Sequence, residues 1–322
     1  MKLEQPARLY RWSCLLVASS VLVLLAGADD SSAGIQGTGR FAMGPITATG
    51  SDGSIVVEGT EYGTSQARIK IDGHIGPATQ LRVGQIVTVR GTSLGSGRGN
   101  ATDVAFTGSV VGPIDHIDVA GGTFTVLGQT VIVDASTLFG DGIQPAALGG
   151  LHLGTDVEVS AFPTASGQQL ASRVDLQTAG APLQVQGLVQ TLNADTQTFH
   201  INGLTVDYSQ AAVTGPLANG NTVTVVATEY PSAGTLHATK VQASNDNNGV
   251  AGLNGQVEGL ITSMPSQSDF FIGSQLIVTN SSTHFVLHGN TLGPNLEVKV
   301  TGTFDSSGAL VADQVHSDQS VK

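Results

Sequence analysis

Apolar and polar residues alternate along most of this chain, and the alternating runs are short. Val157–Ala161, for example, places an apolar side chain at every second position, which is the period of a strand with one buried face. No stretch shows a convincing helical period, and 146–151 has room for one helical turn only. The pattern therefore predicts an all-β protein built from many short strands.

One sequence pattern, which predicts two strands and a turn, occurs four times. A glycine precedes an alternating run, and a polar, Gly-rich turn then leads to a second run that begins with Ala-x-x-Val. Two such runs around a Gly-rich turn predict a β-hairpin, and the leading glycine suits a turn that needs positive φ or a close backbone approach. Recurrence at a nearly constant interval, here roughly 70 residues, indicates a repeat architecture. The four leading glycines are Gly84, Gly154, Gly220 and Gly293.

The first half of each copy repeats as well, as one strand followed by another hairpin. The clearest turn of these hairpins is Asn202-Gly203, a strong two-residue signal. The hairpins at 124–134 and 270–278 are equivalent, and a looser version pairs 54–58 with 67–71. Each copy thus has about five strands, which suits a small closed barrel without exposed edges.

The repeat divides the chain into four tandem β-barrel units that follow an N-terminal signal peptide. The expected ranges are 1–28 for the signal peptide, then 34–107, 108–179, 182–244 and 250–318 for units 1 to 4.

The segment 1–28 has the pattern of a secretory signal. Three basic residues precede the apolar core Leu15–Leu25, and Ala26-Gly27-Ala28 is a small-residue cleavage site. The core is too short for a stable membrane span, which needs about 20 residues. We expect an exported protein, either periplasmic or secreted to the cell surface, and leave open whether the signal is cleaved or kept as an anchor. The only cysteine, Cys14, lies in this segment, so the mature units hold by core packing alone.

The charge of the mature chain limits its partners. Beyond residue 28 there are 10 basic and 24 acidic side chains, a net charge of −14. Such a charge opposes binding to phosphate backbones and to anionic lipid surfaces, and it keeps a secreted protein soluble.

Several short segments together resemble a known family. They are Gly37–Arg40, Gly44-Pro45-Ile46, Gly112-Pro113-Ile114, Thr125–Val131 and Val157–Ser160. Bacterial exported proteins with tandem oligonucleotide/oligosaccharide-binding-like (OB-like) barrels, catalogued only as a domain of unknown function, are similar to them. The resemblance covers nearly all of 34–317 and implies four OB-like units, with no catalytic residues to carry over.

The resemblance also bears on how the protein is anchored. Members of the family are often lipoproteins, with Leu-Ala-Gly-Cys after the apolar core. Here Leu25-Ala26-Gly27 is followed by Ala28, so the chain departs from the lipid-attachment pattern.

Three motifs invite a catalytic or metal-binding interpretation. Gly91–Gly95 matches the Gly-x-Ser-x-Gly nucleophile pattern around Ser93, but it falls in a predicted hairpin turn and not at a strand-to-helix turn, so we interpret it as a chance match. His284 and His288 would share a face on a helix, but the local sequence is typical of strand or loop, which favours solvated loop histidines. Asn245–Gly249 lacks the ligand spacing and closing Glu of a calcium loop, which favours a polar linker. We predict no catalytic, cofactor or metal site.

Aromatic residues decide between two kinds of ligand. Nucleic-acid sites need aromatic platforms and a basic groove. The mature chain has three Tyr, no Trp and a negative net charge, so we expect no nucleic-acid partner. Tyr62, Tyr230 or Phe162 would serve as a stacking surface for a glycan, although the favoured interpretation is that they fill the barrel ends.

The sequence therefore predicts an exported, non-enzymatic cell-envelope protein with a structural or adhesive, binding role. The alternative is a polysaccharide-binding module of the envelope or extracellular matrix, and a third hypothesis is a hydrolase built around Ser93. Envelope polysaccharide and protein are the partners we consider. The ligand, the oligomeric state and the equivalence of the four units stay open.

Overall fold

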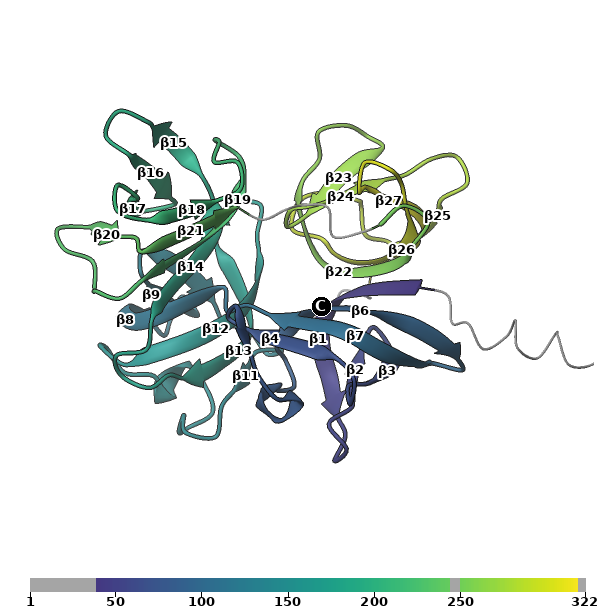
Figure 1. Cartoon of the computed structure of the whole chain (residues 1–322), viewed down its shortest axis with the longest axis horizontal. Helices are drawn as coiled ribbons and strands as arrows, with labels where there is room; N and C mark the ends of the chain where they lie inside the picture. The colour runs from purple at the N-terminus through teal and green to yellow at the C-terminus, as the bar shows by residue number, and fades with distance from the viewer. Residues whose placement is uncertain (1–38, 244–249, 318–322) are drawn as a thin grey trace, which may run out of the picture. The chain divides into compact units, whose positions relative to one another are not determined.

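Strands make up nearly all of the regular structure (Figure 1). The computed structural model describes residues 39–243 and 250–317, and the predicted signal peptide, 1–28, lies outside them. Within these ranges the helical segments are two single 3-10 turns, η1 (Ala78–Gln80) and η2 (Leu148–Gly150), and η2 falls inside 146–151. No helix of the described ranges is long and apolar enough to cross a membrane.

The strands form four groups, here called barrels 1 to 4. Barrel 1 has β1 (Gly39–Thr49), β2 (Ile55–Val57), β3 (Thr60–Gly63), β4 (Arg68–Ile71), β5 (His74–Ile75), β6 (Ile86–Gly95) and β7 (Arg98–Phe106). Barrel 2 has β8 (Val110–Asp118), β9 (Thr123–Val126), β10 (Gln129–Ile132), β11 (Leu138–Phe139), β12 (Asp156–Pro163) and β13 (Gln169–Leu176). Barrel 3 has β14 (Leu183–Leu188), β15 (Gln190–Asn193), β16 (Thr198–Ile201), β17 (Leu204–Asp207), β18 (Ala212–Thr214), β19 (Thr222–Ala227), β20 (Thr235–His237) and β21 (Lys240–Ala243). Barrel 4 has β22 (Asn254–Ser263), β23 (Asp269–Ile272), β24 (Gln275–Val278), β25 (His284–Val286), β26 (Glu297–Phe304) and β27 (Leu310–His316).

Five strands of each group close into an OB-like barrel. In barrel 2, β8 pairs with β9, β9 with β10, β10 with β13, β13 with β12, and β12 with β8 again. The β10–β13 pairing is parallel and the others are antiparallel. Barrels 1 and 4 close in the same order, and Figure 1 shows β22–β27, in yellow-green, rolled into a ring. Barrel 3 uses the same pairings with its first and last strands each divided in two, as β14–β15 and β20–β21. The expected all-β array of four five-stranded OB-like barrels is confirmed.

A short additional strand accompanies every barrel. β4, β11, β18 and β25 each pair in parallel with the last strand of their own barrel. The expectation that 67–71 pairs with 54–58 was therefore wrong, because β4 contacts β7, and the partner of β2 is β3. The turn between β2 and β3 is Glu58-Gly59, with both residues at positive φ, as a two-residue hairpin requires.

The repeated glycine has a defined backbone role in three copies. Its φ is +89°, +76° and +85°, and its N–H donates to a carbonyl of the first strand, as from Gly84 to Ile46 at 2.8 Å. In the fourth copy the residue with this conformation is Asn295, which has φ +66° and donates its N–H to the Ile261 carbonyl at 2.8 Å. The expectation for Gly293 was wrong, because asparagine tolerates the left-handed conformation and takes over the role shortly after it. The three glycines are Gly84, Gly154 and Gly220.

Strand pairing and cores also extend from barrel to barrel within 39–243 and 250–317, which belong to one compact unit. β1 runs parallel to β22 from Arg40 opposite Asn254 onward, so barrels 1 and 4 share a 13-stranded sheet. β8 pairs antiparallel with β14, which joins barrels 2 and 3. Phe41 of barrel 1 lies in the core of barrel 4, 1% exposed and edge-on to Phe304 at 5.4 Å. A single apolar core spans barrels 2 and 3.

Candidate functional site

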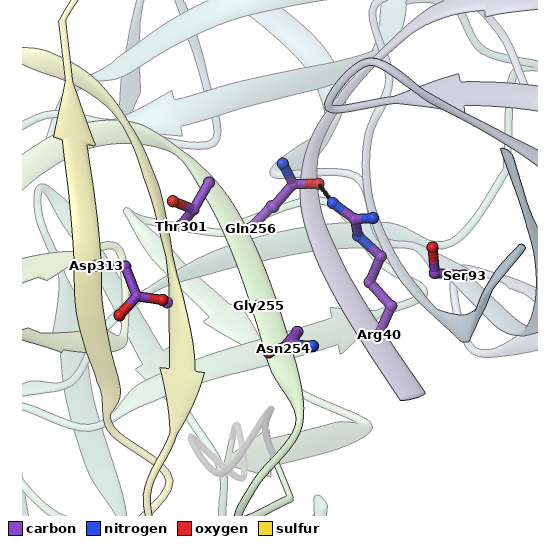
Figure 2. A pocket seen from close by; sticks show the side chains of 8 residues that line it. Arg40, Ser93, Asn254, Gly255, Gln256, Thr301 and Asp313 are labelled. Carbon is purple, nitrogen blue, oxygen red and sulfur yellow. Dashed lines mark hydrogen bonds between the residues drawn. The ribbon is translucent and has the colours of Figure 1, made fainter. Parts of the chain in front are cut away.

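A polar hollow lies on the sheet shared by barrels 1 and 4 (Figure 2). Its volume is about 210 Å³. Register explains its lining, because Arg40 lies opposite Asn254, and Gln256 lies opposite Thr301, which places polar side chains of three strands on one face. Figure 2 shows Arg40 and Gln256 turned toward each other, and the Arg40 guanidinium donates to Gln256 Oε1 at 2.6 Å. The lining consists of Arg40, Ser93, Asn254, Gly255, Gln256, Thr301, Gly302 and Asp313.

Ser93 lines this hollow, but in a setting unlike that of a nucleophile. It lies within strand β6, opposite Gly99 of β7, and the intervening turn is confined to 96–97. The expected position in a hairpin turn was therefore wrong by a few residues. The Ser93 hydroxyl accepts an N–H bond from Gly95 at 3.3 Å, and no histidine is among the lining residues. One guanidinium, one carboxylate and several hydroxyls and amides equip this hollow to bind a polar group.

The second hollow is basic and lies on the outer face of barrel 1, over strands β4, β7 and β6. Its volume is about 180 Å³. Register places Arg68 and Arg90 on either side of Asp103, and Lys70 and Thr88 on either side of Ala105. The small side chain of Ala105 leaves the depression between the longer side chains around it. We call this feature the basic hollow, and its lining is Arg68, Lys70, Thr88, Arg90, Asp103, Val104 and Ala105.

The basic hollow has an excess of positive charge. Arg68 donates from Nε and Nη2 to Asp103 Oδ1, at 2.9 and 2.6 Å, and this hydrogen bonding lowers the pKa of the Asp103 carboxyl. Three cations therefore surround one carboxylate. Residues 39–107 hold six of the ten basic side chains that follow residue 28, against five acidic ones. Barrel 1 is thus the cationic region of a strongly acidic chain.

The three candidate aromatic residues differ in exposure. Tyr62 is 0% exposed and Phe162 8% exposed, so both rings are buried. Tyr230 is 55% exposed, and its hydroxyl donates to Asp156 Oδ2 at 3.1 Å, which raises the pKa of the Tyr230 phenol. Of these three residues, Tyr230 alone presents a ring to solvent.

The histidine pair that the structure brings together is not the one considered from the sequence. His284 lies in β25 opposite Gln314, whereas His288 lies beyond the strand and meets His316 of β27. The Nε2 atoms of His288 and His316 are 3.2 Å apart. Across the described ranges there is no group of three or more His, Cys, Asp or Glu suited to one metal ion, and the segment Asn245–Gly249 lies outside those ranges. The contact between His316 and His288 could not be predicted from the sequence, because the two residues are distant along the chain. The parallel β25–β27 pairing that brings them together has no local sequence signal.

Two glutamates, the buried Glu58 and the half-buried Glu158, have strongly raised pKa values. Burial raises the pKa of Glu58 to about 9, with the neighbouring Glu258 carboxylate adding to the effect. Burial likewise raises the pKa of Glu158 to about 8, assisted by a hydrogen bond with Asp72. Both glutamates lie where barrel 1 meets another barrel, so we assign them to the junctions between barrels.

The chain matches one family model four times. The matches to the Domain of unknown function family DUF5666 cover residues 43–105, 111–175, 184–242 and 258–316. No curated protein matches the chain. Among solved structures, "drosophila Unr CSD456" is 12% identical, with 66% of this chain and 97% of that chain covered and a TM-score of 0.17. Because the four family matches together span most of the chain, this protein belongs to the DUF5666 family, as four tandem copies of the domain.

Proposed function

We propose that this protein is an exported, non-enzymatic component of the bacterial cell envelope, with a structural or binding role. The supporting observation is that barrels 1 and 4 share a sheet, and barrels 2 and 3 share a sheet and a core, instead of being strung on free linkers. Such an array holds several outer faces in fixed relation, which suits a scaffold. The signal-like segment 1–28 and the resemblance to bacterial exported proteins support export.

Export and the absence of enzymatic activity are tested separately. Cell fractionation and mass spectrometry of the chain expressed in a bacterial host should find it outside the cytoplasm, with cleavage following Ala28. Cytoplasmic retention of the full-length chain would contradict export. A panel of ester, peptide and glycoside substrates should show no turnover, and Ser93→Ala is the matched control. Turnover that disappears in Ser93→Ala would contradict the proposal and support the hydrolase hypothesis.

A second candidate function is polysaccharide binding, and the basic hollow favours it. Arginine pairs with carboxylates through two parallel N–H bonds, and Lys70 and Thr88 add a further cation and a hydroxyl beside the two arginines. This lining suits a polysaccharide that bears carboxylate or sulfate groups. Stacking on Tyr62 or Phe162 does not contribute to such binding, because both rings are buried.

The test compares two variants with the same loss of charge. Replacing Arg68, Lys70 and Arg90 with Ala removes the cations of the basic hollow, whereas replacing Arg82, Arg98 and Lys240 with Ala removes three cations elsewhere. Retention on an immobilised uronic-acid polysaccharide should fall at least tenfold in the first variant only, and it should fall with salt. Equal loss in both variants would indicate nonspecific attraction, and no retention of the native chain would remove this candidate.

A further inference from the structure

Two imidazoles meet on barrel 4 at the end of the short additional strand. The parallel pairing of β25 with β27 places Val286 opposite His316, and the chain continues from Val286 to His288. The two Nε2 atoms come within 3.2 Å, with the ring centroids 5.1 Å apart and the ring planes at 77°. His288 is partly exposed to solvent, so the pair can be reached from outside.

A set of hydrogen bonds around Ser317 holds the loop that carries His288. The Ser317 N–H donates to the Val286 carbonyl at 3.0 Å, and its hydroxyl donates to the Leu287 carbonyl at 2.9 Å. The side-chain amide of Asn290 donates to the Ser317 hydroxyl at 3.1 Å. His288 itself has φ +49°, which turns the backbone sharply at this residue. These contacts orient the two imidazoles before any ligand arrives, so little conformational entropy is lost on binding.

The spacing of the two nitrogens matches that of two ligands on one metal ion. Imidazole nitrogens bind zinc at about 2.0–2.1 Å, so two of them lie about 3.4 Å apart around a tetrahedral ion and about 2.9 Å apart at adjacent square-planar positions. The observed 3.2 Å falls between these values. The same distance also suits an N–H···N hydrogen bond between the rings, and a metal ion would replace the proton of that bond.

We propose that Nε2 of His288 and Nε2 of His316 bind one divalent transition-metal ion, with water completing its coordination. Imidazole ligands select copper, nickel and zinc, whereas magnesium and calcium prefer oxygen ligands. With two protein ligands, the site would bind more weakly than a complete structural zinc centre. This site goes beyond the proposed envelope function and does not depend on it.

The surrounding charge favours a cation. Residues 250–317 hold five acidic side chains and one basic one, Lys299. Lys299 lies opposite His316 in the β26–β27 register, and its ammonium is 3.1 Å from the Glu258 carboxylate and 3.7 Å from Glu58. Its charge is therefore compensated by the Glu258 carboxylate.

The test uses the untagged mature chain, so that no added histidine competes. Calorimetric titration with Zn²⁺ near pH 7.5 should give one ion per chain, and Mg²⁺ should give no binding signal. His288→Gln and His316→Gln should each weaken Zn²⁺ binding at least tenfold. His284→Gln is the matched control, from the pair that the sequence suggested, and it should leave binding unchanged.

A second measurement does not depend on the variants. The electron paramagnetic resonance spectrum of the native chain with one equivalent of Cu²⁺ should show coupling to imidazole nitrogen, and His288→Gln should lose one of the two nitrogens. Circular dichroism confirms that each variant is folded. The proposal is overturned if the native chain binds no Zn²⁺, or if His288→Gln and His316→Gln bind it as well as the native chain does.

Discussion

The carboxyl groups at the two junctions of barrel 1 have different neighbouring groups. Where barrel 1 meets barrel 4, Glu58 has a side chain only 1% exposed and lies beside Glu258, with the Lys299 ammonium 3.7 Å away. Where barrel 1 meets barrel 2, Glu158 lies beside Asp72, whose Oδ1 accepts N–H bonds from the Gly108 backbone at 2.9 Å and from the side chain of Gln184, on β14 of barrel 3, at 3.0 Å. One junction thus places a cation beside its acids, and the other gives Asp72 neutral amide donors.

The comparison teaches that burial, more than the nearest partner, sets the protonation state at both junctions. Lys299 lowers the pKa of Glu58, yet burial outweighs this attraction and the pKa still rises to about 9. At the other junction Arg173 lowers the pKa of Glu158, but Arg173 is itself hydrogen-bonded to Asp175, and the pKa rises to about 8. At both junctions the glutamate therefore holds its proton more tightly than a glutamate in water does.

The largest expected effect comes from breaking the apolar contact of the first junction. Phe41→Ala removes a buried ring from the core of barrel 4 and should lower the free energy of unfolding by about 3–5 kcal/mol. Leu94→Ala, at a 56% exposed position of β6, should change it by less than about 0.5 kcal/mol. Urea denaturation measures both. A loss below about 1 kcal/mol for Phe41→Ala would show that β1 does not pack on barrel 4.

The next largest effect is the response of Glu58 to alkali. Between its ordinary pKa of 4.5 and its folded pKa of about 9, the folded chain keeps a proton that the unfolded chain releases. The contribution of this proton to the free energy of unfolding is fully present below pH 4.5. It decreases as pH rises toward the folded pKa, by up to about 1.4 kcal/mol per pH unit. Glu58→Gln should flatten this decline in denaturation measured from pH 6 to pH 10. Glu61→Gln, at a half-exposed position, is the control, and identical pH profiles for both variants would refute the assignment.

Glu158 extends the comparison to the second junction. The direction is the same, since burial also raises its pKa from 4.5, so its contribution to stability is lost as pH rises. Glu158→Gln should therefore flatten part of the decline in stability measured from pH 6 to pH 10. A profile identical to that of the native chain would contradict a raised pKa at this junction.

A smaller effect is expected from the amide donors of the second junction. Gln184→Ala removes the side-chain N–H bonds to Asp72 and to the Gly108 carbonyl, and should lower the free energy of unfolding by about 1–2 kcal/mol. Gln186→Ala, on the same strand at a half-buried position, should cost less. Equal costs for the two variants would mean that the bonds from Gln184 add nothing to the junction.

The fold was predictable from the sequence to the level of each barrel, because the features that specify a barrel are local. Alternation, the Asn202-Gly203 turn and the repeated glycine all act within a few residues. The pairing of barrels was not predictable, since the residues from Arg40 to Met43 carry no local signal that tells whether the free edge of their strand faces solvent or pairs with β22. The position of the two glutamates at the junctions was not predictable either, because a single Glu in a strand or turn has no sequence pattern that indicates burial.

The candidate sites show the same limit. Ser93, the residue with the strongest motif, lies in a strand, and Tyr62, offered as a stacking surface, lies in a core. The basic hollow and the His288–His316 pair each combine residues that only strand register brings together. Register between distant strands is a property of the folded barrel, and the linear order of residues does not report it.

The central claim is that barrels 1 and 4 share a sheet through the parallel pairing of β1 with β22. A chain that begins at residue 29 contains no cysteine, so Arg40→Cys with Asn254→Cys creates a single thiol pair at directly opposed positions. Mild oxidation of the folded chain should close an intramolecular disulfide in nearly every molecule, detected by mass spectrometry and by non-reducing electrophoresis. Arg40→Cys with Asn280→Cys should stay reduced under the same conditions. Failure of the opposed pair to close, or equal closure in both variants, would contradict the shared sheet.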